Sequence, residues 1–265
     1  MAGTGTVAVM IPARRGSTRF PGKPLAPLRG ANGAVKPLIR WTWERAVEGA
    51  GDADVHVLTD DEGIAGVARG FGANVVMTPT GCANGTERCA AALDAALDAE
   101  IVVNVQGDSP LMPPGVVGML VRHLERVPDA MVATPVFVAT GEVRTRLLTE
   151  AMAGRVGGTT VLTDAVGRAL YFSRHVLPHG AAADPAVEVS MHLGIYAYRR
   201  AALATYPDLS SAPAEMAEGL EQLRFLDAGL RVDAVSIAAP TAFWEVNRPE
   251  DVAVVEAALM AAGRS

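Results

Sequence analysis

Short apolar runs rich in β-branched residues alternate along the chain with longer Ala- and Leu-rich segments of helical periodicity. The run Thr6–Ile11 is almost entirely apolar, as is typical of a strand buried on both faces of a parallel sheet. Further strands are expected over residues 54–59, 74–77, 101–106, 130–138, 168–173, 189–198 and 232–237. Helices are expected over residues 37–49, 62–71, 87–99, 116–126 and 216–228, and from about residue 249 onward. The pattern predicts an α/β fold with a mostly parallel sheet, and it predicts no element for residues 140–155.

The helix expected over residues 216–228 is amphipathic. Its apolar face carries Met216, Leu220, Leu223 and Leu226. Its polar face carries Glu218, Glu221 and Gln222. Because no repeat or clear linker interrupts the chain, we expect one domain over residues 1–265, with an elaboration at roughly 130–200.

Composition narrows the class of protein. Of 265 residues, 50% are hydrophobic and 20% are charged, which indicates a folded globular chain, and the net charge of −6 argues against general nucleic-acid binding. Cys82 and Cys89 are too few for a disulfide framework or a paired zinc motif. The N-terminus lacks a signal peptide, and no apolar run reaches the roughly 18 residues of a membrane span. We therefore expect a soluble, cytoplasmic protein without a membrane or nucleic-acid partner.

The charges are distributed unevenly. Residues 1–43 contain seven basic and no acidic residues, whereas the remaining 222 residues contain 16 basic and 29 acidic residues. Two of the seven, Lys23 and Lys36, are the chain's only lysines. A cationic leading segment on an acidic protein predicts a local anion site.

The loop that follows the first predicted strand reads IPARRGSTRFPGKP over residues 11–24. In an α/β sheet this loop lies at the carboxyl edge, where ligands bind. The dinucleotide pattern G-x-G-x-x-G is absent, and the P-loop pattern G-x-x-x-x-G-K-[ST] fails because Gly16 and Gly22 are too far apart and Pro24 follows Lys23. Its cations suit a bound triphosphate, although an arginine-rich, solvated surface loop is the alternative.

Seven sequence blocks together resemble a known family. In chain order they are IPARRGSTRFPGKPL (11–25), NGTER (84–88), VNVQGDSP (103–110), ALYFSR (169–174), HLGIYAYR (192–199), EGLEQLR (218–224) and VNRPEDV (246–252). They resemble the 3-deoxy-manno-octulosonate cytidylyltransferase family over nearly the whole chain. The resemblance implies a Rossmann-like nucleotidyltransferase fold with a smaller β-rich dimerisation elaboration. It implies a homodimer that converts CTP and a 2-keto-3-deoxy sugar acid into a CMP-sugar and pyrophosphate, with Mg²⁺.

The resemblance also assigns roles to individual residues. The catalytic residues it implies are Arg14, Lys23 and Asp108, with Asp108 as a magnesium ligand. The nucleotide-binding residues it implies are Ala13, Arg14, Ser17, Lys23, Arg88 and Gln106. The acceptor-binding residues it implies are Arg174, His192, Tyr196, Glu218, Glu221 and Gln222. Simpler roles stay open: an ordinary carboxylate partner for Arg88, a turn for Asp108, a structural histidine at 192 and a solvated acidic face at 218–222.

The chain departs from the family pattern near the metal. Asn247 stands where the family usually has an aspartate that is the second magnesium ligand, so a full negative charge is missing and metal affinity should fall. Arg248 adds positive charge there, while Glu245 is a nearby carboxylate that could compensate. We therefore interpret the chain as a divergent member acting on 3-deoxy-manno-octulosonate. The alternatives are CMP transfer to another acid, such as a nonulosonic acid or a phosphonate, or a CTP-binding homologue with impaired turnover.

Overall fold

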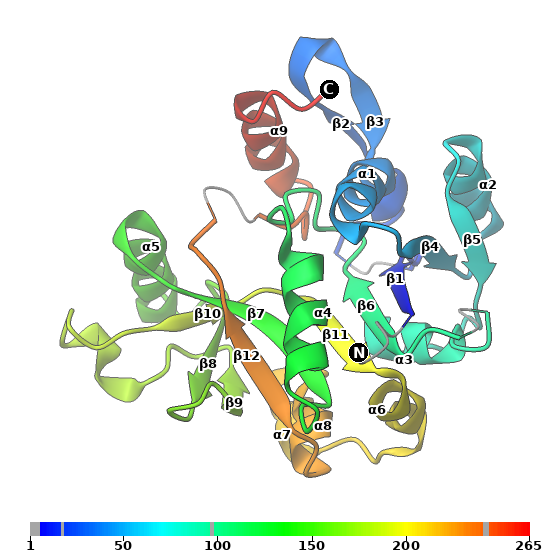
Figure 1. Cartoon of the computed structure of the whole chain (residues 1–265). Coiled ribbons are helices and arrows are strands. Elements are labelled where there is room, and N and C mark those ends of the chain that lie inside the picture. Colours follow the sequence, from blue (N-terminus) through cyan, green and yellow to red (C-terminus); the bar gives the residue numbers. More distant parts are fainter. Residues whose placement is uncertain (1–5, 17–18, 96–97, 241–243) are drawn as a thin grey trace.

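A mixed β-sheet forms the centre of the computed structural model, which describes residues 6–16, 19–95, 98–240 and 244–265 (Figure 1). Its strands run in the order β5-β4-β1-β6-β11-β7-β10-β8-β9, and β12 pairs with β7 beside this path. The strands are β1 (Val7–Pro12), β4 (Asp54–Thr59), β5 (Asn74–Met77), β6 (Ile101–Val105), β7 (Val132–Val138), β8 (Thr159–Thr163), β9 (Ala169–Ser173), β10 (Ser190–His192), β11 (Ile195–Arg199) and β12 (Val232–Ser236).

Pairing directions divide the sheet into two parts. Strands β5, β4, β1 and β6 are parallel, as the alternating pattern predicts, and β12 is parallel to β7. From β6 onward the pairs β6–β11, β11–β7, β7–β10, β10–β8 and β8–β9 are antiparallel. The α/β class is confirmed, and the β-rich elaboration extends the same sheet. Because β1, β4 and β6 run in one direction, the loops that follow them meet at one edge.

Helices cover both faces of the sheet. They are α1 (Leu38–Ala50), α2 (Glu62–Gly70), α3 (Gly85–Ala91), α4 (Val116–Arg126), α5 (Gly141–Met152), α6 (Arg200–Thr205), α7 (Pro213–Glu218), α8 (Leu223–Asp227) and α9 (Asp251–Ala261). Alternate residues of β1 face opposite cores: Val9 and Ile11 pack with α1, α2 and α4, whereas Ala8 and Met10 pack with α3, α6 and α8. A hairpin of β2 (Pro27–Arg29) and β3 (Val35–Pro37) lies beside α9 (Figure 1).

Several predicted elements are wrong in length or continuity. The single helix expected over 216–228 is two short helices, because Gly219 takes a left-handed conformation (φ 63°) that ends α7. Met216 is consequently 69% exposed and does not belong to the apolar face. The strand expected over 189–198 is interrupted between β10 and β11; both pair with β7, but β10 also pairs with β8 whereas β11 also pairs with β6. The helix expected over 87–99 ends at Ala91, as α3.

Other elements were not predicted at all. Helix α5 occupies most of the segment 140–155, for which the hydrophobic periodicity predicts no element. It has a single buried residue, Leu147, so its amphipathic signal is weak. Strand β8 and the β2–β3 hairpin are also additions. In the described part of the chain, no helix combines the length and apolarity needed to cross a membrane.

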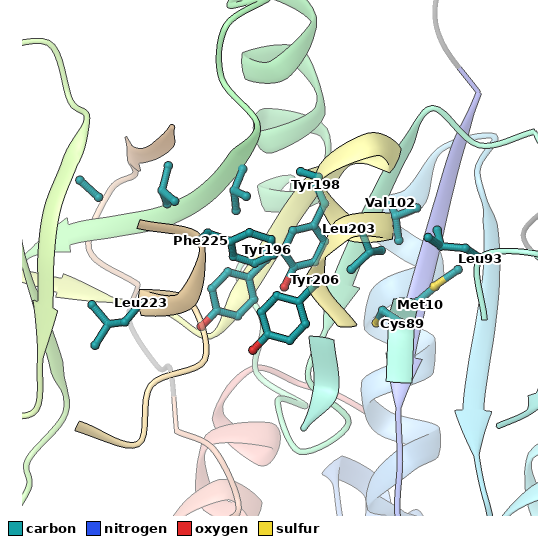
Figure 2. Close-up of a cluster of buried hydrophobic side chains, with 14 of the residues drawn as sticks. Met10, Cys89, Leu93, Val102, Tyr196, Tyr198, Leu203, Tyr206, Leu223 and Phe225 are labelled. Carbon is teal, nitrogen blue, oxygen red and sulfur yellow. The ribbon is translucent and has the colours of Figure 1, made fainter. Parts of the chain in front are cut away.

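An aromatic cluster fills the core beneath β11. Figure 2 shows Tyr196, Tyr198, Tyr206 and Phe225 packed together, with the three tyrosine hydroxyls directed toward the same side. The ring of Phe225 lies 5.6 Å from Tyr198 and 4.9 Å from Tyr206, centroid to centroid. Phe225 therefore anchors the short helix α8 against the sheet.

His192 is part of the same buried layer. Its ring packs 5.1 Å from Phe172 and 5.3 Å from Tyr196, and its Nε2 lies 2.8 Å from the Thr134 hydroxyl. Burial disfavours the charged imidazolium and lowers the pKa of His192 to about 3. The imidazole is therefore neutral in the folded protein at neutral pH.

We predict that Phe225→Ala lowers the free energy of unfolding by about 3–5 kcal/mol, because it leaves a cavity between two buried tyrosines. Met216→Ala is the matched control in the same region and should change that free energy by less than about 0.5 kcal/mol, since its side chain is exposed. Urea unfolding at pH 7.5 measures both. Equal losses in the two variants would contradict the division into α7 and α8.

The buried neutral His192 should also make stability depend on pH. In the unfolded chain the imidazole takes up a proton below about pH 6.5, whereas in the folded protein it stays neutral until about pH 3. Stability is therefore lost as the pH falls through this window. Between pH 7.5 and 5.0, His192→Gln should lose about 2 kcal/mol less unfolding free energy than the wild type. The same acid-induced loss in both proteins would rule out this imidazole as the titrating group.

Candidate active site

The site is built where the loops after β1 and β6 touch. Ala13 donates its backbone N–H to the carbonyl of Leu58 (2.8 Å), which fixes the start of the first loop to β4. At Gly107 a Cβ atom would lie only 2.6 Å from the carbonyl oxygen of Pro12, so only glycine permits the two loops to approach this closely. This contact sets the positions of the side chains that follow on each loop.

Lys23 and Asp108 meet across these two loops. Gly22 is left-handed (φ 71°) and turns the chain into a short 3₁₀ helix that starts at Lys23. The Lys23 ammonium donates a hydrogen bond to Oδ2 of Asp108, and the two side chains are 15% and 19% exposed. The structure therefore places two of the predicted site residues side by side, as a partly buried cation and carboxylate.

A third segment, residues 244–248, joins them. The backbone N–H of Val246 donates to the carbonyl of Asp108 (3.1 Å), which holds the segment against the β6 loop. Asn247 donates from Nδ2 to Oε2 of Glu245 (3.5 Å) and accepts a hydrogen bond from Arg19 Nη2 on Oδ1 (3.2 Å). Burial and the nearby Asp108 charge raise the pKa of Glu245 to about 7, against hydrogen bonds from Asn247 and Ser109.

Arg19 and Glu245 therefore belong to this centre; from the sequence, Arg19 has no predicted role and Glu245 is only a nearby carboxylate that could compensate for Asn247. The signal for Glu245 is the spacing of two residues from Asn247, which puts both side chains on one side of an extended segment. For Arg19 the sequence holds no comparable signal, because its partner lies 228 positions away.

The remaining nucleotide-site candidates lie around the same edge. Arg14 is exposed and donates to the carbonyl of Ala83 (3.3 Å), while Ser17 lies outside the described residues. Gln106 lies beside the start of α3, where a Cβ on Gly85 would be 3.2 Å from its Nε2. The nucleotide contacts of these residues stay predictions.

Arg88 is buried at the carboxyl end of β4. Its guanidinium donates to the hydroxyl of Thr78 and pairs with Oδ2 of Asp60 at 3.0 Å. The carboxylate partner that the sequence left open as the simpler role is thus present. Asp60 directly follows β4, so this pair ties α3 to the sheet edge. Its predicted contact with a nucleotide stays a prediction.

Two of the acceptor candidates meet at the end of β9. Glu218 accepts hydrogen bonds from the Ser173 hydroxyl (2.7 Å) and the Arg174 backbone N–H (2.9 Å). Burial opposes ionisation, but the hydrogen bonds from Arg174 and Ser173 prevail and lower the pKa of Glu218. The Arg174 guanidinium donates to the carbonyl of Gly219 (2.9 Å). Glu218 is therefore an ionised carboxylate held beside an exposed arginine.

The other acceptor candidates lie deeper. The Tyr196 hydroxyl donates to Oε1 of Gln222 (3.1 Å), and Nε2 of Gln222 is buried without a hydrogen-bond partner in the described part of the chain. Glu221 accepts from the backbone N–H of Thr86 (3.2 Å), and burial raises its pKa. His192 packs against Tyr196, as described above. The start of α3 thus lies between the acceptor candidates and Gln106.

The cationic leading segment does not converge on one point. Lys36 and Arg40 both pair with Glu44 of α1, at 2.7 and 2.9 Å. Arg15 pairs with Asp61 at 3.2 Å. Among the described basic residues of this segment, Lys23 and Arg19 contact the Asp108–Asn247 centre. The count of basic residues in the sequence therefore overstates how many cations lie at this centre, and the anion site stays a prediction.

The oxygen donors of this centre suit a magnesium ion. Mg²⁺ is usually bound by one or two protein carboxylates together with substrate phosphates. Asp108 and Glu245 offer two carboxylates, and Asn247 offers an amide oxygen. Within the described residues no group of three or more His, Cys, Asp or Glu side chains gathers into a metal site, so this centre offers two carboxylates rather than a full set of protein ligands. The donor set therefore fits a magnesium ion that keeps room for phosphate oxygens.

Comparisons with known proteins place the chain in a family. The family model described as cytidylyltransferase matches residues 8–233. A 3-deoxy-manno-octulosonate cytidylyltransferase from Maricaulis maris is 39% identical over 97% of this chain and 98% of its own length. An 8-amino-3,8-dideoxy-manno-octulosonate cytidylyltransferase from Shewanella halifaxensis is 39% identical over 96% of this chain and 98% of its own.

A solved structure agrees with these relatives. It is described as CMP:2-keto-3-deoxy-manno-octonic acid synthetase complexed with CTP, and it is 33% identical to this chain. The two superpose with a TM-score of 0.82 over 96% of this chain and 98% of the other. The family model covers the parallel strands, the elaboration and both loops that carry Lys23 and Asp108. The chain belongs to the cytidylyltransferase family.

Proposed function

We propose that the protein transfers CMP from CTP to 3-deoxy-manno-octulosonate and releases pyrophosphate. The observation that carries the proposal is the Lys23–Asp108 pair at the carboxyl edge of the sheet. A reaction that cleaves a triphosphate needs a cation for the leaving group and a carboxylate that can hold a metal ion. The name of the Maricaulis maris relative supports 3-deoxy-manno-octulosonate as the acceptor, and the similar structure complexed with CTP supports CTP as the nucleotide.

In this reaction the anomeric hydroxyl of the sugar acid attacks the α-phosphorus of CTP. A new oxygen–phosphorus bond forms while the bond between the α-phosphorus and the bridging oxygen breaks, and the hydroxyl proton is released. Negative charge therefore grows on pyrophosphate as it leaves. The Lys23 ammonium, fixed by Gly22 and by Asp108, would stabilise that charge.

Asp108 would hold Mg²⁺, with the oxygens of the 245–247 segment beside it. When bound, the ion neutralises phosphate charge and orients the triphosphate for displacement. Arg19, which now donates to Asn247, and exposed Arg14 would add positive charge along the same loop. These side chains let two anions approach each other at short range.

The acceptor would bind beside the acceptor candidates, which extend from the exposed Arg174 to the buried Tyr196. The exposed Arg174 guanidinium suits the sugar-acid carboxylate, and ionised Glu218 suits sugar hydroxyls. Unpartnered Nε2 of buried Gln222 is a donor left for a ligand. We further propose that the enzyme is a homodimer, in line with the resemblance of its blocks to the family.

A second acceptor has its own support. The Shewanella halifaxensis relative is named for an 8-amino-3,8-dideoxy sugar acid, and it is as similar to this chain as the Maricaulis maris relative. A nonulosonic acid, a phosphonate and CTP binding without turnover are the further alternatives. An assay of pyrophosphate release with a panel of acceptors distinguishes these alternatives.

The assay measures pyrophosphate release for each of the four nucleoside triphosphates, with each acceptor of a panel. The panel contains 3-deoxy-manno-octulosonate, its 8-amino analogue, a nonulosonic acid and a phosphonate. We expect CTP with 3-deoxy-manno-octulosonate to have the highest kcat/KM and to give a CMP-sugar by mass spectrometry. A higher kcat/KM for another acid, or CTP binding without pyrophosphate release, would overturn the proposed acceptor or the proposed turnover.

Lys23→Ala tests the role of the loop. We expect kcat to fall by about 10²–10³, because one charge contact to the transition state is lost. Lys36→Ala is the matched control: it removes the chain's other lysine, whose ammonium pairs with Glu44, and should leave kcat near the wild-type value. Pyrophosphate release under saturating CTP measures both. If Lys23→Ala turns over as fast as Lys36→Ala, Lys23 has no part in the reaction.

A further inference from the structure

We propose that Glu245 supplies the second carboxylate of the magnesium centre and that Asn247 positions it. This inference rests on the proposed function, which supplies the bound Mg²⁺ and CTP. It concerns which side chains of the protein hold the metal ion. It assigns the ligand role to Glu245 rather than to Asn247, which stands at the position where the family usually has its second aspartate.

The first support is the placement of the Glu245 carboxylate. The hydrogen bond from Val246 N–H to the Asp108 carbonyl holds the segment against the β6 loop. The Glu245 carboxylate belongs to the residue that precedes Val246, and the charges of Asp108 and Lys23 both act on it. Two carboxylates and one lysine thus share a partly buried space. Such a pair of carboxylates is favourable when a cation lies between them.

The second support is the state of the Asn247 amide. Its oxygen accepts from the Arg19 guanidinium at 3.2 Å, and its nitrogen donates toward Glu245 Oε2 at 3.5 Å. This orientation is the one that satisfies both neighbours, because a guanidinium only donates and a carboxylate only accepts. The amide oxygen is therefore engaged by a cation already. Asn247 acts on the metal through Glu245.

The third support is the space around Glu245. At Gly194, which joins β10 to β11, a Cβ atom would lie 3.3 Å from Oε1 of Glu245 and 3.5 Å from Cγ of Gln106. Glycine here leaves the second carboxylate oxygen uncrowded beside the nucleotide-site candidate Gln106. The break between β10 and β11 thus gives Glu245 room to reach the centre.

Charge decides between the two side chains. A magnesium ion gains more from an anionic oxygen than from an amide oxygen, and Asn247 is already flanked by Arg19 and Arg248. Glu245 is the carboxylate on that segment, next to the residue whose N–H bonds the Asp108 carbonyl. The second anionic ligand therefore comes from position 245.

The test measures binding of Mn²⁺ as a probe for Mg²⁺, by electron paramagnetic resonance, with and without saturating CTP and without acceptor. We expect Glu245→Gln and Asp108→Asn each to weaken Mn²⁺ binding in the CTP complex by about tenfold or more. Glu245→Asp, which keeps the charge, should retain tighter binding than Glu245→Gln. Glu125→Gln, at an exposed carboxylate of α4, is the control and should bind Mn²⁺ as the wild type does.

Thermal unfolding of each variant confirms that it is folded before metal binding is compared. The assignment of Glu245 is overturned if Glu245→Gln binds Mn²⁺ within twofold of the wild type while Asp108→Asn does not. Because no acceptor is present, this outcome is independent of the acceptor panel. Loss of Mn²⁺ affinity in Glu245→Gln together with turnover of another acid would leave Glu245 as a ligand and overturn only the proposed acceptor.

Discussion

The structure depends on holding one ammonium and one carboxylate together at the edge of a parallel sheet. Lys23 and Asp108 come from loops that follow different strands, and each loop is fixed by a backbone constraint before the side chains meet. Gly22 sets the direction of the first loop, and the approach of Gly107 to the Pro12 carbonyl sets the second. A partly buried charge pair is stable only when its geometry is good, so these glycines are a condition for the site.

That edge also explains why the second half of the chain folds as it does. Strand β11 inserts antiparallel beside β6, which brings Tyr196 opposite Asn104 and places the aromatic cluster directly under the site. The cluster then holds α8 through Phe225, and α8 with its preceding turn carries Glu221 and Gln222. Packing energy of the aromatic layer is thereby used to place polar groups near the nucleotide loop. A buried polar group is costly unless it is partnered, and within the described residues Gln222 Nε2 has no hydrogen-bond partner.

Much of the parallel half could be predicted from the sequence. Strands such as β4 and β5 have the bounds that their short runs rich in β-branched residues predict. The meeting of the two loops that carry Lys23 and Asp108 at one edge follows from strand direction alone. The second half was harder, because its elements are short and end for reasons outside periodicity. The helical pattern at 216–228 continues through Gly219, yet a left-handed residue there divides it. Pairing across the sheet, which local sequence does not encode, decides where β10 ends and β11 begins.

The placement of the carboxylates at the site is likewise something that the local sequence does not predict. The distribution of charge along the sequence shows an excess of basic residues over residues 1–43. The comparison of motifs shows that position 247 carries an amide in place of a carboxylate. Neither shows that Glu245 lies on a segment held against the Asp108 loop, because that depends on a backbone hydrogen bond between residues 108 and 246. In an extended segment, positions 245 and 247 share a side, so a carboxylate can move by two residues and still reach the same space. Its longer side chain spans the difference, and the amide left at 247 becomes a bridge between Arg19 and that carboxylate. With Glu245 as the proposed ligand, the charge of the magnesium centre is kept while its sequence position changes.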